Sequence, residues 1–254
     1  NNKIILTVVA VFVFFISYLL LPTFFKNDDI SKKLKNELLN KFDLDFAFKK
    51  NLKYNFFPQP HFIIKDASII QSQKNISDID TLKIYISLNN LFSLKNININ
   101  EVILENANFE IESKNSNFFL KLLNKNFSNM NFKVKNSNIF FRNLDNEVLF
   151  INKINSLKYY HDPKELKNIL YSENEIFNTP YSLEIIDLKD EKKIYTKLKL
   201  GIVKLEIENV FDYNDDIKIG SAIIEFDNKK SFIDYKTNKN FLDFEYYNEL
   251  DKQK

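Results

Sequence analysis

The sequence predicts a mostly β protein with a few helices, in which one N-terminal transmembrane helix precedes an antiparallel sheet. Three observations predict this class. An apolar run lies near the N-terminus, an amphipathic helical stripe follows it directly, and apolar and polar residues alternate through much of the remainder. Alternation with a period of two places the apolar side chains of a strand on one face.

The apolar run covers residues 4–21 and contains only three polar side chains, those of Thr7, Ser17 and Tyr18. As an α-helix it would span about 27 Å, close to the roughly 30 Å of a bilayer's hydrocarbon layer. No pair of small residues suited to signal peptidase follows the run, so we expect an uncleaved anchor. A cleaved signal peptide and a buried core helix are the alternatives.

The charges beside this run leave its orientation open. Lys3 precedes it, whereas Lys26, Lys32 and Lys33 follow it. Counting these charges would place the C-terminal side in the cytoplasm, but the charge rule constrains long domains only weakly.

Residues 22–45 predict a juxtamembrane amphipathic helix. Ile30, Leu34, Leu38 and Phe42 recur every four residues and form one apolar stripe, and lysines occupy the other side. The stripe packs on the following sheet or rests on anionic headgroups, and packing is the expected arrangement.

The strands follow from residue 46 onward, interrupted by two short helical inserts that we expect near 116–126 and 163–172. The second insert rests on Asp162-Pro163, a helix cap followed by a proline at the first helical position. The Asn-rich joints, including residues 106–108, predict turns between strands.

Composition excludes several classes of function. The net charge is +2 without a block of like charge, so we expect no nucleic-acid partner. There is no cysteine, only two glycines, and two histidines that stand far apart in sequence. We therefore expect no metal site, no cofactor and no phosphate-binding loop. The pairs Asp43/Asp45 and Asp78/Asp80 have no nucleophile or histidine beside them, so we expect no catalysis.

Three stretches after the anchor carry a resemblance to a known family. They are the aromatic-Pro segment and strand at residues 55–69, the strand, turn and further strands at 82–107, and the strand pair at 132–141. In this order they resemble the N-terminal region of the AsmA family over roughly the first 160 residues.

The resemblance implies a single-pass anchor in a bacterial inner membrane, with residues 1–3 in the cytoplasm and residues 46–254 as a periplasmic β-groove domain. It also implies an open, curved antiparallel sheet rather than the closed sandwich that the same alternation would allow. Such a protein would bind or conduct phospholipid acyl chains for outer-membrane assembly and homeostasis. The candidate groove lining is Leu82, Ile84, Ile86, Ile97, Ile99, Phe109, Ile111, Phe132 and Val134.

A different class of function is also consistent with the sequence. A non-catalytic scaffold or regulator of envelope assembly would bind a protein partner through a free sheet edge. The last expected strand, near Phe241 to Tyr246, would provide that edge.

Overall fold

The computed structural model describes residues 2–49, 52–71, 73–89, 91, 97–112, 131–213, 217–238 and 240–248. It confirms the predicted fold class: the chain is mostly β, with one N-terminal apolar helix and an open, curved antiparallel sheet. The chain divides into two compact units, the first ending at Phe109 and the second containing the strands from residue 131 onward.

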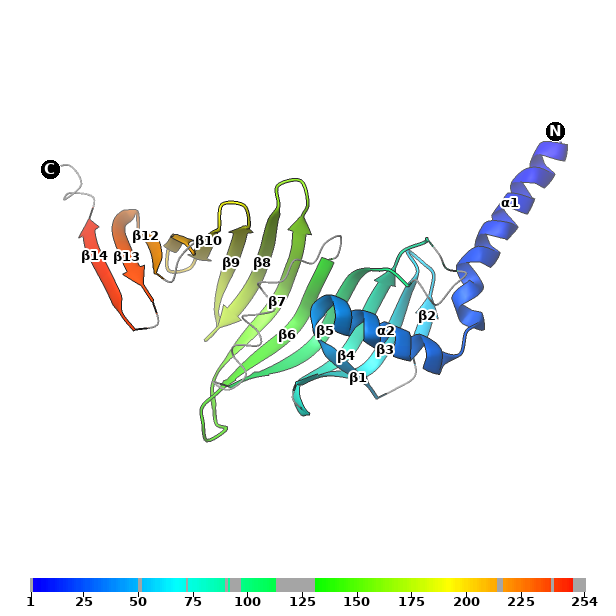
Figure 1. Cartoon of the computed structure of the whole chain (residues 1–254), viewed down its shortest axis with the longest axis horizontal. Helices are drawn as coiled ribbons and strands as arrows, with labels where there is room; N and C mark the ends of the chain where they lie inside the picture. Colours follow the sequence, from blue (N-terminus) through cyan, green and yellow to red (C-terminus); the bar gives the residue numbers. More distant parts are fainter. Residues whose placement is uncertain are drawn as a thin grey trace. The chain divides into compact units, whose positions relative to one another are not determined.

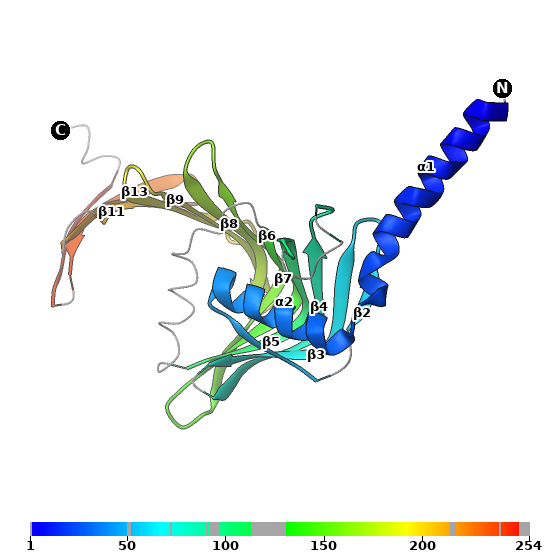
Figure 2. The same cartoon turned by 45° about the vertical axis from the view of Figure 1, so that its right-hand side comes forward.

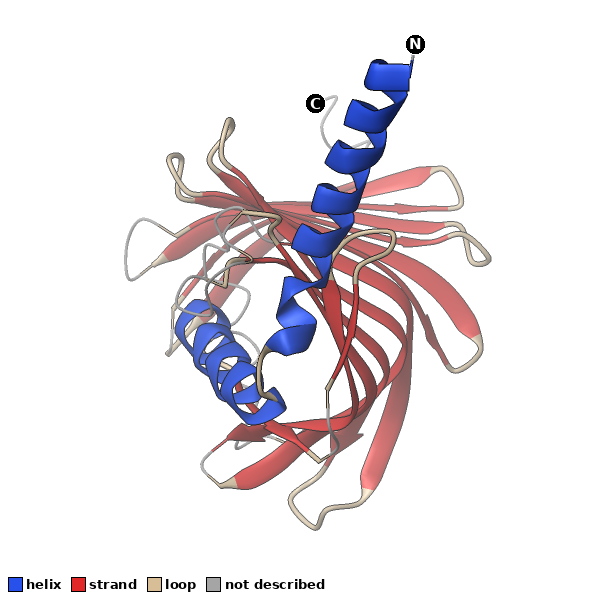
Figure 3. Ribbon diagram, turned by 90° about the vertical axis from the view of Figure 1, so that its right-hand side faces the viewer, coloured by secondary structure: helices blue, strands red, loops and turns tan. Residues whose placement is uncertain are grey.

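The first unit begins with helix α1 (Asn2–Leu20), a short 3₁₀ helix η1 (Leu21–Phe24) and helix α2 (Asn27–Phe42), which follow one another in Figure 3. Its strands are β1 (Asp45–Phe48), β2 (Lys53–Asn55), β3 (His61–Gln71), β4 (Lys74–Ile86) and β5 (Ile99–Ile111). They hydrogen-bond in the order β1-β3-β4-β5, and β2 pairs with the start of β3. Helix α1 exposes nearly all its apolar side chains and is long and apolar enough to cross a membrane.

Helix α2 closes the core of the first unit. Asp28 and Asp29 lie in its first turn, and Asp43 ends it in the left-handed conformation. Its apolar stripe is fully buried, and the helix lies across β3, β4 and β5 in Figures 1 and 2. The register sets buried side chains directly opposite one another below it, in the rows Phe62–Ile84–Val102 and Ile64–Leu82–Leu104.

Two of the three long strands of this unit, β3 and β5, each contain a residue in the left-handed conformation. Asp66 and Asn106 adopt positive φ values of 56° and 54° inside β3 and β5. In β5 the successive residues Glu105 and Asn106 both point away from the core, so that Leu104 and Ala107 on either side of them are both buried. The turn predicted at 106–108 is therefore wrong: asparagine tolerates the left-handed backbone, and the strand bends there instead of ending.

The second unit contains nine strands in its described part, each hydrogen-bonded to the next in sequence order. They are β6 (Asn131–Arg142), β7 (Val148–Asp162), β8 (Lys167–Ile176), β9 (Thr179–Leu188), β10 (Lys193–Leu200), β11 (Leu205–Asp212), β12 (Lys218–Phe226), β13 (Lys229–Thr237) and β14 (Leu242–Asn248). Figure 2 shows β8 to β13 as a single layer.

The helical insert predicted near 163–172 is wrong, because residues 163–166 form a turn and β8 begins at Lys167. The expected capping contacts do form: the backbone N–H groups of Lys164 and Glu165 donate to Asp162 Oδ1 at 2.9 and 3.4 Å. Leu166 then adopts a φ of 47°, which ends the helical path. As a strand, β8 pairs with β7 on one side and with β9 on the other, and this pairing satisfies the hydrogen-bonding groups of its backbone. The insert predicted near 116–126 lies outside the described residues.

Gly220 is the buried one of the two glycines, and it packs closely against a tyrosine of the neighbouring strand. Gly220 on β12 faces Tyr235 on β13, whose ring lies over it and whose hydroxyl donates to Asn209 Oδ1 on β11 at 2.9 Å. A Cβ at residue 220 would lie 2.9 Å from the ring carbon Cε1 and closer still to its tip. Glycine at residue 220 therefore leaves the space that the Tyr235 ring occupies.

Candidate lipid-binding face

One face of the second unit carries an apolar row across four strands. Leu183 of β9 stands opposite Leu198 of β10, which stands opposite Ile207 of β11, and Ile207 stands opposite Ile224 of β12. Directly opposed residues of an antiparallel pair share one face. A neighbouring row on the same face adds Ile185 and Ile233. We call these six side chains the open face: Leu183, Ile185, Leu198, Ile207, Ile224 and Ile233.

The open face is only half buried. Each of its six side chains retains intermediate exposure, and after Leu170 no apolar side chain that the structure describes is buried. A sheet that packed on a second sheet or a helix would bury such a row. The open face is therefore apolar surface available to a ligand in the described part of the chain.

The opposite face of the same strands carries ion pairs. Lys197 lies next to Leu198 in sequence, and its ammonium donates to Glu206 and Glu208 at 2.6 and 2.7 Å. These hydrogen bonds raise the pKa of Lys197 and lower that of Glu206. Charged groups that pair at the surface are compatible with water, so the two faces of β10 and β11 differ sharply in polarity.

A network of polar side chains borders the open face along β7 to β9. His161 Nδ1 lies 2.9 Å from Asn168 Oδ1, and the Tyr213 hydroxyl donates to Asp187 Oδ1 at 3.0 Å. Burial raises the pKa of Tyr213 to about 12, so it stays protonated and keeps donating. Asn168 and Asp187 are buried, and both have partners in this network. Their satisfied hydrogen bonds indicate a structural role rather than a binding site.

The predicted lining residues of β4 and β5 lie in the closed core of the first unit. Leu82, Ile84 and Ile99 have no exposed surface, and Ile86, which pairs with Ile99, and Phe109 are also buried. Helix α2 already covers this part of the sheet, so in this structure an acyl chain would have to displace the helix to reach it. Ile111 is half-buried at the end of β5, and Ile97 is half-buried before that strand begins.

Phe132 and Val134, the other predicted lining residues, lie in the second unit. They are buried on β6, opposite Tyr159 and Leu157 of β7, and their rows continue through β8 to the open face. The sequence prediction omitted all six residues of the open face. The alternation around Leu198 and Ile207 predicts that these side chains lie on the apolar face of the sheet. It does not predict which part of that face other elements of the protein cover.

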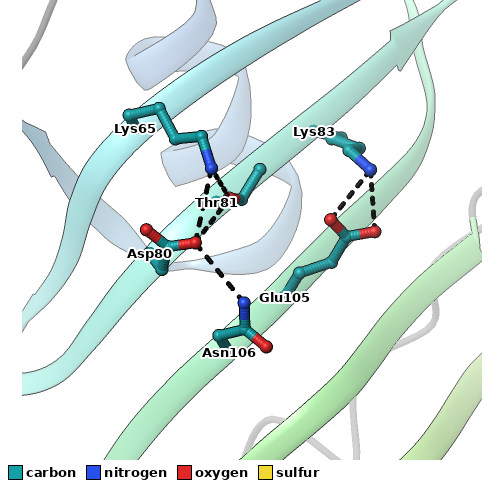
Figure 4. A network of polar contacts seen from close by, with 6 residues as sticks. All are labelled: Lys65, Asp80, Thr81, Lys83, Glu105 and Asn106. Carbon is teal, nitrogen blue, oxygen red and sulfur yellow. Dashed lines mark hydrogen bonds and ion pairs between the residues drawn. The ribbon is translucent and has the colours of Figure 1, made fainter.

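At least one aspartate of each predicted carboxylate pair lies in a contact that the structure describes. Asp43 ends helix α2, and Asp80 belongs to a surface network that Figure 4 shows on the outer side of β3 to β5. Asp80 Oδ2 accepts hydrogen bonds from Thr81, Asn106 and Lys65, which lower the pKa of its carboxyl group. Beside it, Lys83 Nζ pairs with Glu105 at 2.8 Å. No metal-binding group of histidines and carboxylates occurs among the described residues.

Comparison with known protein families gives a match to the AsmA family. The sequence model of this family matches residues 1–230 of the 254 residues. No curated protein matches the chain.

Proposed function

Because the chain belongs to the AsmA family, we propose that it is a single-pass inner-membrane protein that binds phospholipid acyl chains on its open face. In this proposal the sheet lies in the periplasm and conducts lipids for outer-membrane assembly and homeostasis, without a catalytic step. Helix α1 provides the anchor, because most of its 19 residues are apolar and exposed.

The single observation that carries the proposal is the half-exposed apolar row on β9 to β12. Each methylene of an acyl chain that leaves water for an apolar contact gains about 0.8 kcal/mol. Leu183, Leu198, Ile207 and Ile224 follow one another at the spacing of adjacent strands, about 4.8 Å. An extended chain lying across the strands would therefore contact the apolar side chain of each strand in turn.

Photocrosslinking in intact cells tests this proposal with the full chain. A photoreactive amino acid at Leu198 or Ile207 would face the acyl chain, whereas the same residue at Lys197 or Glu208 would face the other side of the same strands. We expect phospholipid adducts, detected by mass spectrometry of the purified protein, at the first two positions and not at the second two. Equal lipid adducts on both faces, or none on the open face, would contradict the proposal.

A specific observation also favours the alternative of a scaffold that binds a protein. Strand β14 pairs with β13 on one side, and Phe244 and Tyr246 on it are each 60% exposed. An edge strand presents unpaired backbone groups to which another strand can add. A photoreactive residue at Phe244 would then form an adduct with one defined protein or a second copy. The absence of any protein adduct there would leave only the lipid-binding proposal.

A further inference from the structure

The end of helix α1 is attached to two segments of the first unit. The Tyr54 hydroxyl on β2 donates to the carbonyl oxygen of Leu19 at 2.7 Å. The Tyr18 hydroxyl donates to the carbonyl oxygen of Leu88 at 2.5 Å and accepts from the Leu91 N–H at 3.3 Å. Burial raises the pKa of Tyr54 to about 12, so this donor persists at any physiological pH. The last turn of α1 and β2 are therefore held side by side, as Figures 1 and 2 show.

This attachment sets the depth of the first unit relative to a bilayer. Helix α1 has 19 residues, which corresponds to about 28 Å and to the hydrocarbon thickness of a membrane. Leu20 then lies where the hydrocarbon ends and the headgroups begin. Because Tyr54 contacts Leu19, the segment that follows β2 begins at the same level.

Exposed aromatic side chains gather at this level. Phe57, in the segment between β2 and β3, and Phe24, in η1, are each 81% exposed, and Phe56 is 40% exposed. A shallow pocket of about 240 Å³ opens between the anchor and this segment, lined by Leu20, Thr23, Tyr54, Asn55, Phe56 and Phe57. Phenylalanine rings this exposed are unfavourable in water, whereas aromatic rings are well suited to the boundary between headgroups and hydrocarbon.

We propose that the segment between β2 and β3, through its exposed Phe57, and Phe24 at the end of η1 form a second membrane contact that docks on the headgroup layer of the bilayer spanned by α1. This contact would add to the hydrogen bonds that attach the first unit to the anchor and would hold the unit against the membrane surface. The proposal rests on the anchor and on the aromatic side chains beside it. It goes beyond lipid binding by the open face and does not depend on it.

The absence of tryptophan from the sequence allows a direct test. In the full chain reconstituted into phosphatidylcholine vesicles, Phe57→Trp would be the sole tryptophan. Phe57 is exposed, so the larger ring can be accommodated without repacking a core. We expect its emission to be blue-shifted, and to be quenched most strongly by lipids that carry bromine near the headgroup end of the acyl chain.

Two further single-tryptophan variants provide references. Phe14→Trp in the middle of α1 should be quenched most strongly by bromine deep in the acyl chains. Lys74→Trp lies at the start of β4, opposite the last residue of β3, and therefore stands about 33 Å along β3 from the aromatic segment. This variant gives the emission wavelength of a tryptophan that is exposed to water on the same unit. If Phe57→Trp has the emission of Lys74→Trp and no brominated lipid quenches it, the proposed membrane contact does not exist, whatever the crosslinking at the open face shows.

Discussion

Replacing Leu34 with alanine tests whether α2 is packed in a closed core. Leu34 has no exposed surface, whereas Leu39 on the same helix is 44% exposed. Removing a fully buried leucine side chain costs the transfer free energy of the lost methyl and methylene groups and also leaves a cavity. Such substitutions destabilise by 2–5 kcal/mol in protein cores, and we expect about 3 kcal/mol for Leu34→Ala. Leu39→Ala removes half-solvated surface and should cost under about 1 kcal/mol.

Urea unfolding of the full chain in detergent micelles, followed by circular dichroism of the β-sheet signal, measures this difference. With a denaturant slope of roughly 1.5 kcal/mol/M for a unit of this size, Leu34→Ala should lower the midpoint of the first transition by about 2 M. Leu39→Ala should lower it by less than about 0.7 M. The two substitutions remove the same atoms from the same helix, so helix propensity cancels between them.

One result would refute the reasoning. If both substitutions shift the midpoint equally little, α2 is not packed on the sheet. The helix would then rest on lipid headgroups, which is the alternative that its lysine-rich side leaves open. The apolar residues of β4 and β5 below it would in that case be available to lipid.

Two further substitution pairs follow from the burial of single residues. Ile99→Asp buries an unpaired carboxylate under α2, so we expect a loss of about 4 kcal/mol or more and unfolding of the first unit, seen by limited proteolysis. Ile207→Asp, on the open face, should leave the protein folded and abolish lipid adducts, and unfolding there would indicate a closed core instead. Gly220→Ala should destabilise the second unit by 1–3 kcal/mol, because its Cβ would overlap the ring of the tyrosine on β13. Gly201→Ala meets no atom within 4 Å and serves as its control; equal midpoints for the two in urea unfolding would contradict the overlap.

Local periodicity was enough to predict the helix after the anchor and most strands. The stripe Ile30, Leu34, Leu38 and Phe42 appears in full as the buried side of α2. The prediction failed at 163–172, where the spacing of Leu166, Ile169 and Leu170 fits a helix. The same segment also fits the alternation of a strand. Its hydrogen bonds to β7 and β9 make it a strand rather than a helix. Such bonds join residues distant in sequence, so a local pattern cannot reveal them.

Whether a stretch of apolar sheet becomes core or ligand surface depends on the length of the helix available to cover it. Helix α2 has 16 residues and is therefore about 24 Å long, which matches roughly five strands at a spacing of 4.8 Å. The first unit has four strands in hydrogen-bonding order, β1-β3-β4-β5, and their inward side chains are buried. In the second unit, where the described part of the chain contains no helix, apolar side chains are buried on β6 to β8 and are no longer buried from β9 onward. The same alternation therefore yields a dry core under α2 and leaves half-exposed leucines and isoleucines on β9 to β12, the surface that we propose for acyl chains.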